Sequence, residues 1–227
     1  MSAAYIIDTE TTDADDPQVI ELAYMGPLDS ALAVGTPTLL NFKPTKPIAL
    51  GALATHHIIA DDLQGCPEWS LDAFVLPADT QYIVGHKIDF DWKAIGSPSV
   101  KRICTLALAR HVWPTLDSHK LAALIYHLYP HAMARDLVKN AHNAAADVGL
   151  CQRLLAALWD AAGRPATWEQ FWLISEKARV PTVFTFGKHQ GKPIAEIRRS
   201  DPSYISWCLS KCDIVTGDPY WQKALTQ

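Results

Sequence analysis

At 227 residues, the chain is long enough for one domain of ordinary size with an appendage, or for two small domains. Hydrophobic residues make up 49% of it, charged residues only 19%, and the net charge is −4. This composition provides a substantial core and excludes the overall basic field typical of proteins that bind nucleic acid through charge alone, so any such contact must be local.

The cysteines and the N-terminal segment indicate the compartment. An odd number of cysteines without a C-x-x-C pair argues against a disulfide framework or a zinc ribbon. The chain starts without a basic segment, and no apolar run approaches the roughly 20 residues of a membrane-spanning helix. We therefore expect reduced thiols, a cytoplasmic location and no membrane association.

The N-terminal part reads as strands. Short apolar or β-branched runs bounded by Asp, Gly and Pro predict strands over 4–10, 18–25 and 37–42, which would form an antiparallel meander. A helix is expected over 48–56, after Pro47. A fourth strand over 81–84 ends at Gly85 and His86.

The middle of the chain reads as helices. They are expected over 103–112, after Ser118 as N-cap and through Leu128, and over 144–161 with Asn143 as N-cap. Gly163 and Pro165 predict a boundary between a domain over 1–163 and a smaller one over 164–227. In the smaller domain we expect a helix over 167–178, a strand over 183–186, a turn over 187–192 and a helix from Asp201-Pro202. The mixture indicates an α/β or α+β protein.

The first strand carries the most informative pair of residues. Asp8 and Glu10 follow an apolar run and are one residue apart, so on a strand both side chains point to the same face. Two carboxylates this close repel each other unless a cation lies between them. Because Mg²⁺ takes oxygen ligands, the pair predicts a metal-dependent phosphate-chemistry site. A solvated strand end is the alternative.

A second cluster opens the helix expected over 144–161. Asp147 shares a helix face with Cys151 and Leu154, so it lies at the N-terminal end of a buried stripe, where a carboxylate needs a partner. His142 lies just before this helix. A neutral imidazole can deprotonate water at physiological pH, so the pattern predicts a general base; a surface histidine beside a helix cap is the alternative.

A third cluster, Gly85 to Trp92, directly follows the fourth strand. It contains Asp89 and Asp91. Either is suited to be a metal ligand with the other as a helix N-cap, and the spacing leaves both assignments open.

Together the three motifs resemble those of the DEDDh 3′→5′ exonucleases: D-x-E after the first strand, H-x₄-D after a middle strand, and A-H-x-A-x-x-D at the start of a late helix. The tail, with Thr185 to Lys192 and Asp201 to Trp207, resembles the C-terminal extension of the exodeoxyribonuclease X group of that family. This resemblance covers nearly all of the chain. It implies an α/β, ribonuclease H-like fold, with a mixed sheet flanked by helices and a small α+β C-terminal extension.

The resemblance also implies a mechanism: hydrolysis of the 3′-terminal phosphodiester of DNA to 5′-mononucleotides with two Mg²⁺ or Mn²⁺ ions. The family spacing counted from His86 selects Asp91 over Asp89. Asp8 would bridge both ions, and His142 would deprotonate the attacking water. The implied metal ligands are four carboxylates: Asp8, Glu10, Asp91 and Asp147.

Six residues are expected to contact the substrate, DNA rather than RNA, at its 3′ end: Thr11, Thr12, His86, Lys87, Lys188 and Lys192. The chain departs from the family at Lys87, where Asn is usual. It departs again after Glu10, where an acidic loop, Asp13 to Asp16, replaces Thr-x-Gly-Leu. An exoribonuclease with the same site and a polymerase-associated or nucleic-acid-binding module with weak activity are the alternatives. The C-terminal domain could instead dock a protein partner.

Overall fold

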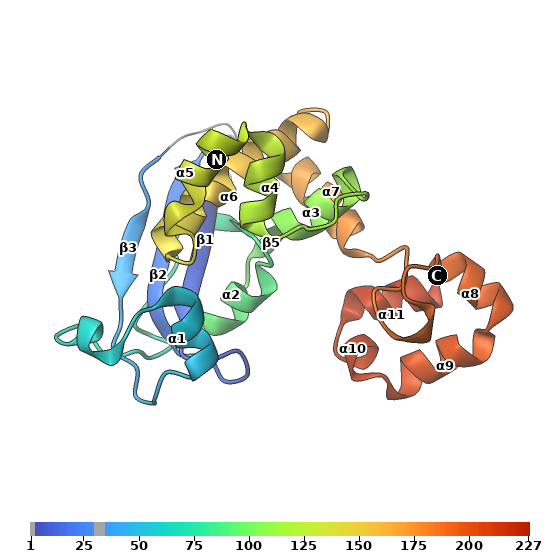
Figure 1. Ribbon diagram of the computed structural model, residues 1–227, viewed down its shortest axis with the longest axis horizontal. Coiled ribbons are helices and arrows are strands. Elements are labelled where there is room, and N and C mark those ends of the chain that lie inside the picture. The colour runs from blue at the N-terminus through green and yellow to red at the C-terminus, as the bar shows by residue number, and fades with distance from the viewer. Residues whose placement is uncertain (1–2, 30–34) are drawn as a thin grey trace. The chain divides into compact units, whose positions relative to one another are not determined.

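A computed structural model describes residues 3–29 and 35–227 of the chain (Figure 1). The protein divides into two compact units, Met1–Ser175 and Glu176–Gln227. Among the described residues, no helix is long and apolar enough to cross a membrane.

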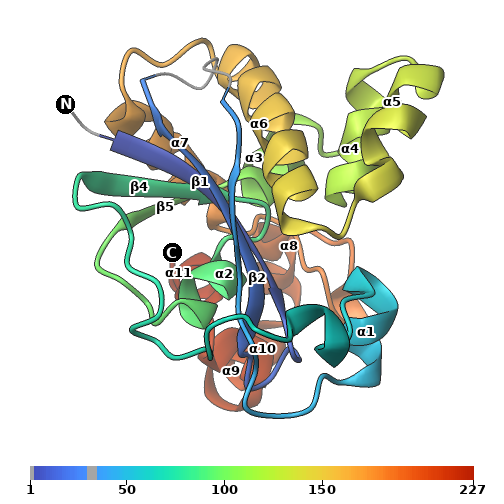
Figure 2. The same cartoon turned by 90° about the vertical axis from the view of Figure 1, so that its left-hand side faces the viewer.

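The first unit is built on a five-stranded mixed sheet with the strand order β3-β2-β1-β4-β5 (Figure 2). Strands β1, β2 and β3 form the expected antiparallel meander, whereas β4 runs parallel to β1 and β5 runs parallel to β4. The strands are β1 (Ala3–Thr11), β2 (Val19–Leu28), β3 (Thr38–Asn41), β4 (Thr80–Gly85) and β5 (Lys101–Cys104).

Helices flank this sheet. They are α1 (Leu50–His56), α2 (Asp89–Ala94), α3 (Thr105–Val112), α4 (Leu121–Leu128), α5 (His131–Leu137), α6 (Ala144–Ala161) and α7 (Trp168–Arg179), with short 3₁₀ turns η1 (Ala60–Leu63) and η2 (Val138–Asn140). Helix α6 packs on β1 and β2, and α3 and α4 pack against α6 (Figure 2). Asn143 caps α6 as expected, because its side chain accepts a hydrogen bond from the amide of Ala146.

Alternation along β1 separates the two faces of the sheet. Ile7 belongs to a buried cluster with Ile83 of β4, with Ile88 just before α2 and with Ala94 at the end of α2. Asp8 and Glu10 are the next even-numbered residues and therefore point to the opposite face, which α6 covers. One face of β1 thus packs in the core, and the residues at the end of its other face point toward the start of α6.

Two predicted helix starts were wrong. Ser118 does not cap α4, because Lys120 holds the N-cap position of that helix. The helix expected over 103–112 begins only at Thr105, because Lys101–Cys104 form the edge strand β5. Pairing with β4 fixes that strand: Ile103 lies opposite Val84 and both are fully buried. A short segment of four residues shows no periodicity of its own, so its tertiary pairing decides its structure.

The second unit is mainly helical. It contains η3 (Gly187–His189), α8 (Ile194–Ser200), α9 (Pro202–Lys211), α10 (Asp213–Thr216) and α11 (Pro219–Thr226). In place of the expected strand over 183–186 there is a single antiparallel bridge between Val183 and Pro193, since a proline has no N–H to extend the pairing. Asp201 caps α9 through the amide of Tyr204.

This unit has a hydrophobic core of its own around Phe184, Cys208 and Trp221. The start of α7 belongs to the first unit, because the rings of Trp168 and Phe171 lie 5.2 and 4.9 Å from that of Trp159. The contacts thus divide the chain after Ser175. The expected domain boundary after residue 163 stays a prediction.

Candidate active site

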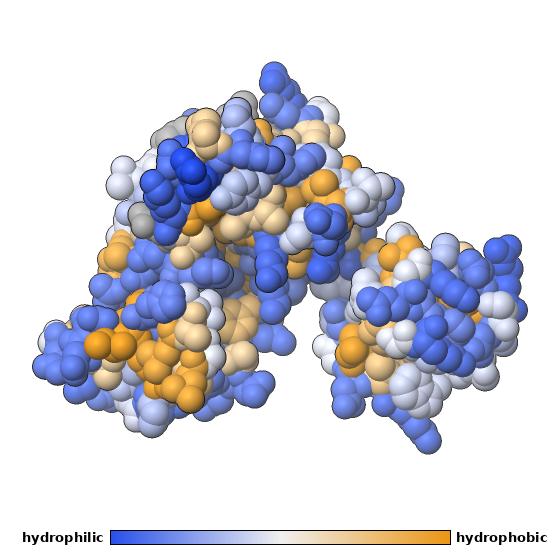
Figure 3. All heavy atoms as spheres, viewed as in Figure 1, coloured by the Kyte–Doolittle hydropathy of each residue, from blue (hydrophilic) through white to orange (hydrophobic). Residues whose placement is uncertain are grey.

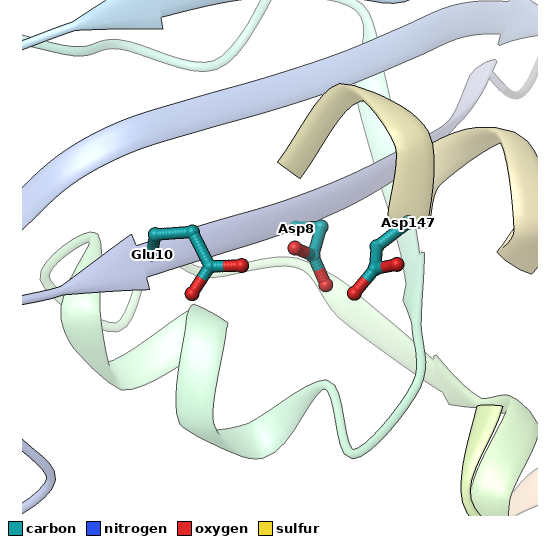
Figure 4. A group of neighbouring side chains, drawn as sticks. All are labelled: Asp8, Glu10 and Asp147. Carbon is teal, nitrogen blue, oxygen red and sulfur yellow. The ribbon is translucent and has the colours of Figure 1, made fainter. Parts of the chain in front are cut away.

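Three carboxylates meet where β1 leaves the core. Asp8 and Glu10 come from the same face of β1, and Asp147 comes from the first turns of α6 (Figure 4). Each offers an oxygen, and these oxygens all lie within 4.8 Å of one another. Glu10 and Asp147 are 137 residues apart in the sequence. The end of β1 and the N-terminus of α6 nevertheless place their carboxylates close enough to share one cation.

Asp91 is a fourth carboxylate beside this group. Its side chain is 4% exposed, and its Oδ1 accepts hydrogen bonds from the amide and hydroxyl of Thr9, at 2.9 and 2.7 Å. Asp89, the competing residue, instead forms an ion pair with Arg102 near the surface. The buried position and the bonds to β1 assign Asp91, not Asp89, to the neighbourhood of Asp8.

His142 stands at the entrance to α6. Its backbone has a left-handed φ of 68°, which is unusual for a residue other than glycine, and its amide is 3.4 Å from Oδ2 of Asp147. His142 is exposed. Burial raises the pKa of Asp147, and the amide of His142, followed by its ring, opposes that rise without cancelling it. The histidine therefore lies beside the carboxylates with its ring open to solvent.

The buried carboxylates of this cluster repel one another, and a cation between them would relieve that repulsion. Burial, followed by the negative charges around it, raises the pKa of Asp8 well above its ordinary value and that of Glu10 to about 8. Burial also raises the pKa of Asp91 and of Asp147. Without a positive charge between them, these acids keep their protons to a higher pH than they do in water.

A divalent metal fits the residues present. Oδ1 of Asp147 is buried and has no hydrogen-bond partner among the described residues, which costs free energy unless a ligand satisfies it. The donor set consists of carboxylate oxygens only, the ligands that Mg²⁺ and Mn²⁺ take. The cluster is therefore a candidate site for a hard divalent cation.

Glu21 is a fifth buried carboxylate, which the motifs did not assign to the site. It lies opposite Glu10 in the pairing of β1 with β2 and is 6% exposed. Its Oε1 accepts hydrogen bonds from the amide of Ala144 at 2.7 Å and from the side chain of Asn143 at 3.0 Å. Glu21 thereby anchors the N-terminus of α6, three residues before Asp147. A lone charge inside the apolar strand Val19–Leu28 was the available signal.

Two clefts open from the carboxylates, each of about 620 Å³. They share five lining residues: Asp8, His86, Lys87, His142 and Asp147. The first cleft continues along α1, past Ala52 and Thr55, to Phe90 of α2. The second continues past Arg110, Asp117 and Lys120, so away from the carboxylates its wall carries more basic than acidic side chains. The candidate metal ligands thus lie where the two clefts meet.

Only some of the residues expected to contact the substrate line a cleft. Thr11 and Lys87 line the first cleft, whereas Thr12 is fully buried and its hydroxyl accepts a hydrogen bond from the amide of Gln18. His86 lines both clefts, but Nε2 lies 2.9 Å from the carbonyl of His119 and Nδ1 lies 3.1 Å from the hydroxyl of Thr105.

Burial lowers the pKa of His86 to about 4, so the ring is neutral. Because both of its ring nitrogens are hydrogen-bonded, His86 helps to hold the wall of the second cleft in place.

The last two residues expected to contact the substrate, Lys188 and Lys192, belong to the second unit.

The acidic loop after Glu10 is partly neutralised. Lys46 forms ion pairs with Asp13 and Asp16, at 2.8 and 2.9 Å. Oδ1 of Asp13 also accepts hydrogen bonds from the amides of Asp15 and Asp16, which close the loop into a turn. Two of its three acidic side chains therefore have a cationic partner, which weakens their repulsion of a phosphate.

Known proteins resemble both units. Residues 184–213 match the family described as exodeoxyribonuclease X-like C-terminal. Exodeoxyribonuclease 10 of Escherichia coli strain K12 is 27% identical over 213 residues, which are 94% of this chain and 93% of that protein. A solved structure of exonuclease X in complex with 5′ overhanging duplex DNA is 26% identical, with a TM-score of 0.61, over 76% of this chain and 99% of that one.

The predicted resemblance to the DEDDh exonucleases, with exodeoxyribonuclease X among the relatives, is confirmed. The ribonuclease H-like fold is confirmed too. A zinc-bound complex of Escherichia coli exonuclease I with single-stranded DNA shares that fold at 19% identity and a TM-score of 0.57, over 72% of this chain and 42% of the other. The relatives support the prediction that this chain is an enzyme of the exonuclease class.

Proposed function

We propose that this protein is a metal-dependent 3′→5′ exodeoxyribonuclease that releases 5′-mononucleotides. One observation carries the proposal: carboxylates from β1, α2 and α6 converge, beside an exposed histidine, at the meeting point of two clefts. The names of the relatives favour DNA as substrate. Five free thiols are typical of a reducing compartment, so we also propose that the enzyme works in the cytoplasm.

Asp8, Glu10, Asp91 and Asp147 would hold two Mg²⁺ or Mn²⁺ ions. When bound, such ions stabilise the charge that develops on the phosphoryl and leaving oxygens and lower the pKa of water. The unpartnered Oδ1 of Asp147 and the raised pKa of Glu10 support this assignment, since both call for a cation.

His142 would act as the general base. Its ring is open to the cleft and its amide is close to Asp147, so a water between the carboxylates and the ring has an acceptor for its proton. The water oxygen bonds to the phosphorus, the proton passes to the imidazole, and the P–O3′ bond breaks. The phosphate leaves on the terminal nucleotide. The shortened strand keeps its 3′ oxygen with the electron pair of the broken bond, and this oxygen takes a proton from solvent water to become a hydroxyl.

The two clefts suggest how the strand lies. We assign the terminal nucleotide to the first cleft, where Thr11 and Phe90 line the wall, and the preceding phosphates to the second. Lys87, Arg110 and Lys120 supply the positive charge that phosphates need there. This placement keeps the scissile phosphate beside the carboxylates.

A gel assay on 5′-labelled single-stranded DNA, with Mg²⁺, Mn²⁺ or EDTA, tests the proposal. The expected result is a metal-dependent ladder that shortens from the 3′ end, lost in Asp147→Asn and kept in Asp160→Asn, an exposed residue of the same helix. Immediate release of a labelled mononucleotide would indicate 5′→3′ polarity and contradict the proposal. An RNA of the same sequence in parallel lanes decides between exodeoxyribonuclease and exoribonuclease.

A further inference from the structure

The two units carry opposite charge. Residues 176–227 contain eight Lys and Arg against five Asp and Glu, whereas residues 1–175 contain twelve against nineteen. The face of the second unit seen in Figure 3 is largely hydrophilic. A basic appendage on an acidic chain has the charge that a polyanion needs.

Within this unit, an aromatic pair is presented at the surface of α9. Trp207 is 46% exposed, and its ring stacks on that of Tyr204 with centroids 5.6 Å apart and planes 25° apart. An exposed aromatic ring is suited to stack on a nucleic-acid base, because every base has a π-face. One face of the tryptophan is covered by the tyrosine, and the pair forms a platform.

Cations flank the platform. Lys188 lies over the ring of Tyr204, with Nζ 5.0 Å from its centroid, and Lys211 follows Trp207 by one helical turn and is exposed. We call Lys188, Tyr204, Trp207 and Lys211 the aromatic–lysine patch. Two aromatic rings with a lysine over one of them and a second lysine one helical turn away match the chemistry of an unpaired nucleic-acid strand, which has bases to stack and phosphates to neutralise.

The patch is held in place by its surroundings. Asp201 caps α9 and pairs with both Lys188 at 2.7 Å and His189 at 3.0 Å. Gly187 has a left-handed φ of 68°, and a Cβ there would lie 2.2 Å from the hydroxyl of Tyr204, so only glycine lets this turn approach the ring. The turn and the helix thus present the ammonium and the ring together.

We propose that the aromatic–lysine patch is a second nucleic-acid-binding surface, at which Trp207 stacks on a base of an unpaired strand and Lys188 and Lys211 contact its phosphates. The inference rests on the proposed function for the identity of the ligand. It assigns the C-terminal unit the role of retaining a strand through contacts of its own.

The test is binding of a 5′-labelled single-stranded oligonucleotide to the full-length protein in EDTA, followed by fluorescence anisotropy. Trp207→Ala is expected to weaken binding about 5- to 150-fold, the usual effect of removing one stacking aromatic, and Trp207→Phe to keep most of the affinity. The double change Lys188→Gln with Lys211→Gln should reduce the slope of log affinity against log salt by about 1.4. Lys223→Gln, an exposed lysine of α11, is the matched control for charge alone.

Hydrolysis of a p-nitrophenyl ester of a 5′-mononucleotide with Mn²⁺ separates this inference from the proposed function, because so small a substrate reaches only the carboxylates. Loss of oligonucleotide affinity in Trp207→Ala, with ester hydrolysis intact, supports the inference. Wild-type affinity in Trp207→Ala, or equal losses in Lys223→Gln and the lysine double variant, overturns it and favours a protein partner for the patch. Binding that depends on Trp207 in a chain that hydrolyses neither substrate supports the patch and contradicts the nuclease.

Discussion

The anchoring of α6 by Glu21 leads to a quantitative prediction. In Glu21→Ala, the backbone amide of Ala144 and the side-chain Nδ2 of Asn143 lose a charged acceptor at 2.7 and 3.0 Å. Hydrogen bonds to a charged group contribute about 1.5–3 kcal/mol each, so the start of the helix loses roughly 3–6 kcal/mol of anchoring before the relief of repulsion in the cluster offsets part of it. Glu21→Gln keeps an Oε1 acceptor and forfeits only the charge.

Groups that orient a metal ligand typically change affinity or activity by about 10- to 100-fold when removed. We therefore expect Glu21→Ala to displace Asp147, and so to weaken Mn²⁺ binding and lower kcat by about that factor. Glu21→Gln should keep most of the Mn²⁺ affinity and most of the kcat. Mn²⁺ titration and hydrolysis of DNA by each variant provide the assay, with the exposed Glu68→Ala as control. Equal damage by Ala and Gln would refute the reasoning, because it would mean that the negative charge itself is required. Wild-type behaviour of Glu21→Ala would refute the anchor altogether.

Further outcomes follow from the same site. His142→Ala should retain Mn²⁺ binding and slow turnover about 10²- to 10⁴-fold, the usual contribution of a general base; near-normal turnover would remove the histidine from the mechanism. Metal-free protein should lose stability as pH rises from about 4.3 to about 8. The pKa of the Glu10 carboxyl is about 8 in the folded protein and about 4.3 in the unfolded chain. The carboxyl therefore favours folding while protonated and opposes it once ionised. In thermal unfolding, Mg²⁺ should therefore raise the Tm more at pH 8 than at pH 6, and an equal rise at both would contradict the assignment of the acidic cluster as a cation site.

Much of this fold follows from local patterns. The apolar run before Asp8 predicts β1, and Asn143 with its following alanines predicts a helix over 144–161, the bounds that α6 has. These signals are local because a strand alternates every two residues and a cap acts within one turn.

The remainder depends on pairs distant in the sequence. Asp91 is distinguished from Asp89 by hydrogen bonds to Thr9, 82 residues away, which no spacing reveals without the family resemblance. Glu21 owes its role to Ala144, 123 residues away. Such groups become visible only when the sheet brings β1, β2 and α6 together.

The central claim is that the four acidic residues hold two divalent ions that drive hydrolysis. Its most direct test is a Mn²⁺ titration of the full-length protein by calorimetry, run beside Asp8→Asn. The account predicts two bound ions in the wild type, and loss of both binding and DNA hydrolysis in the variant, since Asp8 lies at the centre of the carboxylates. DNA hydrolysis that persists in Asp8→Asn, or a wild type that binds no ion, would contradict it.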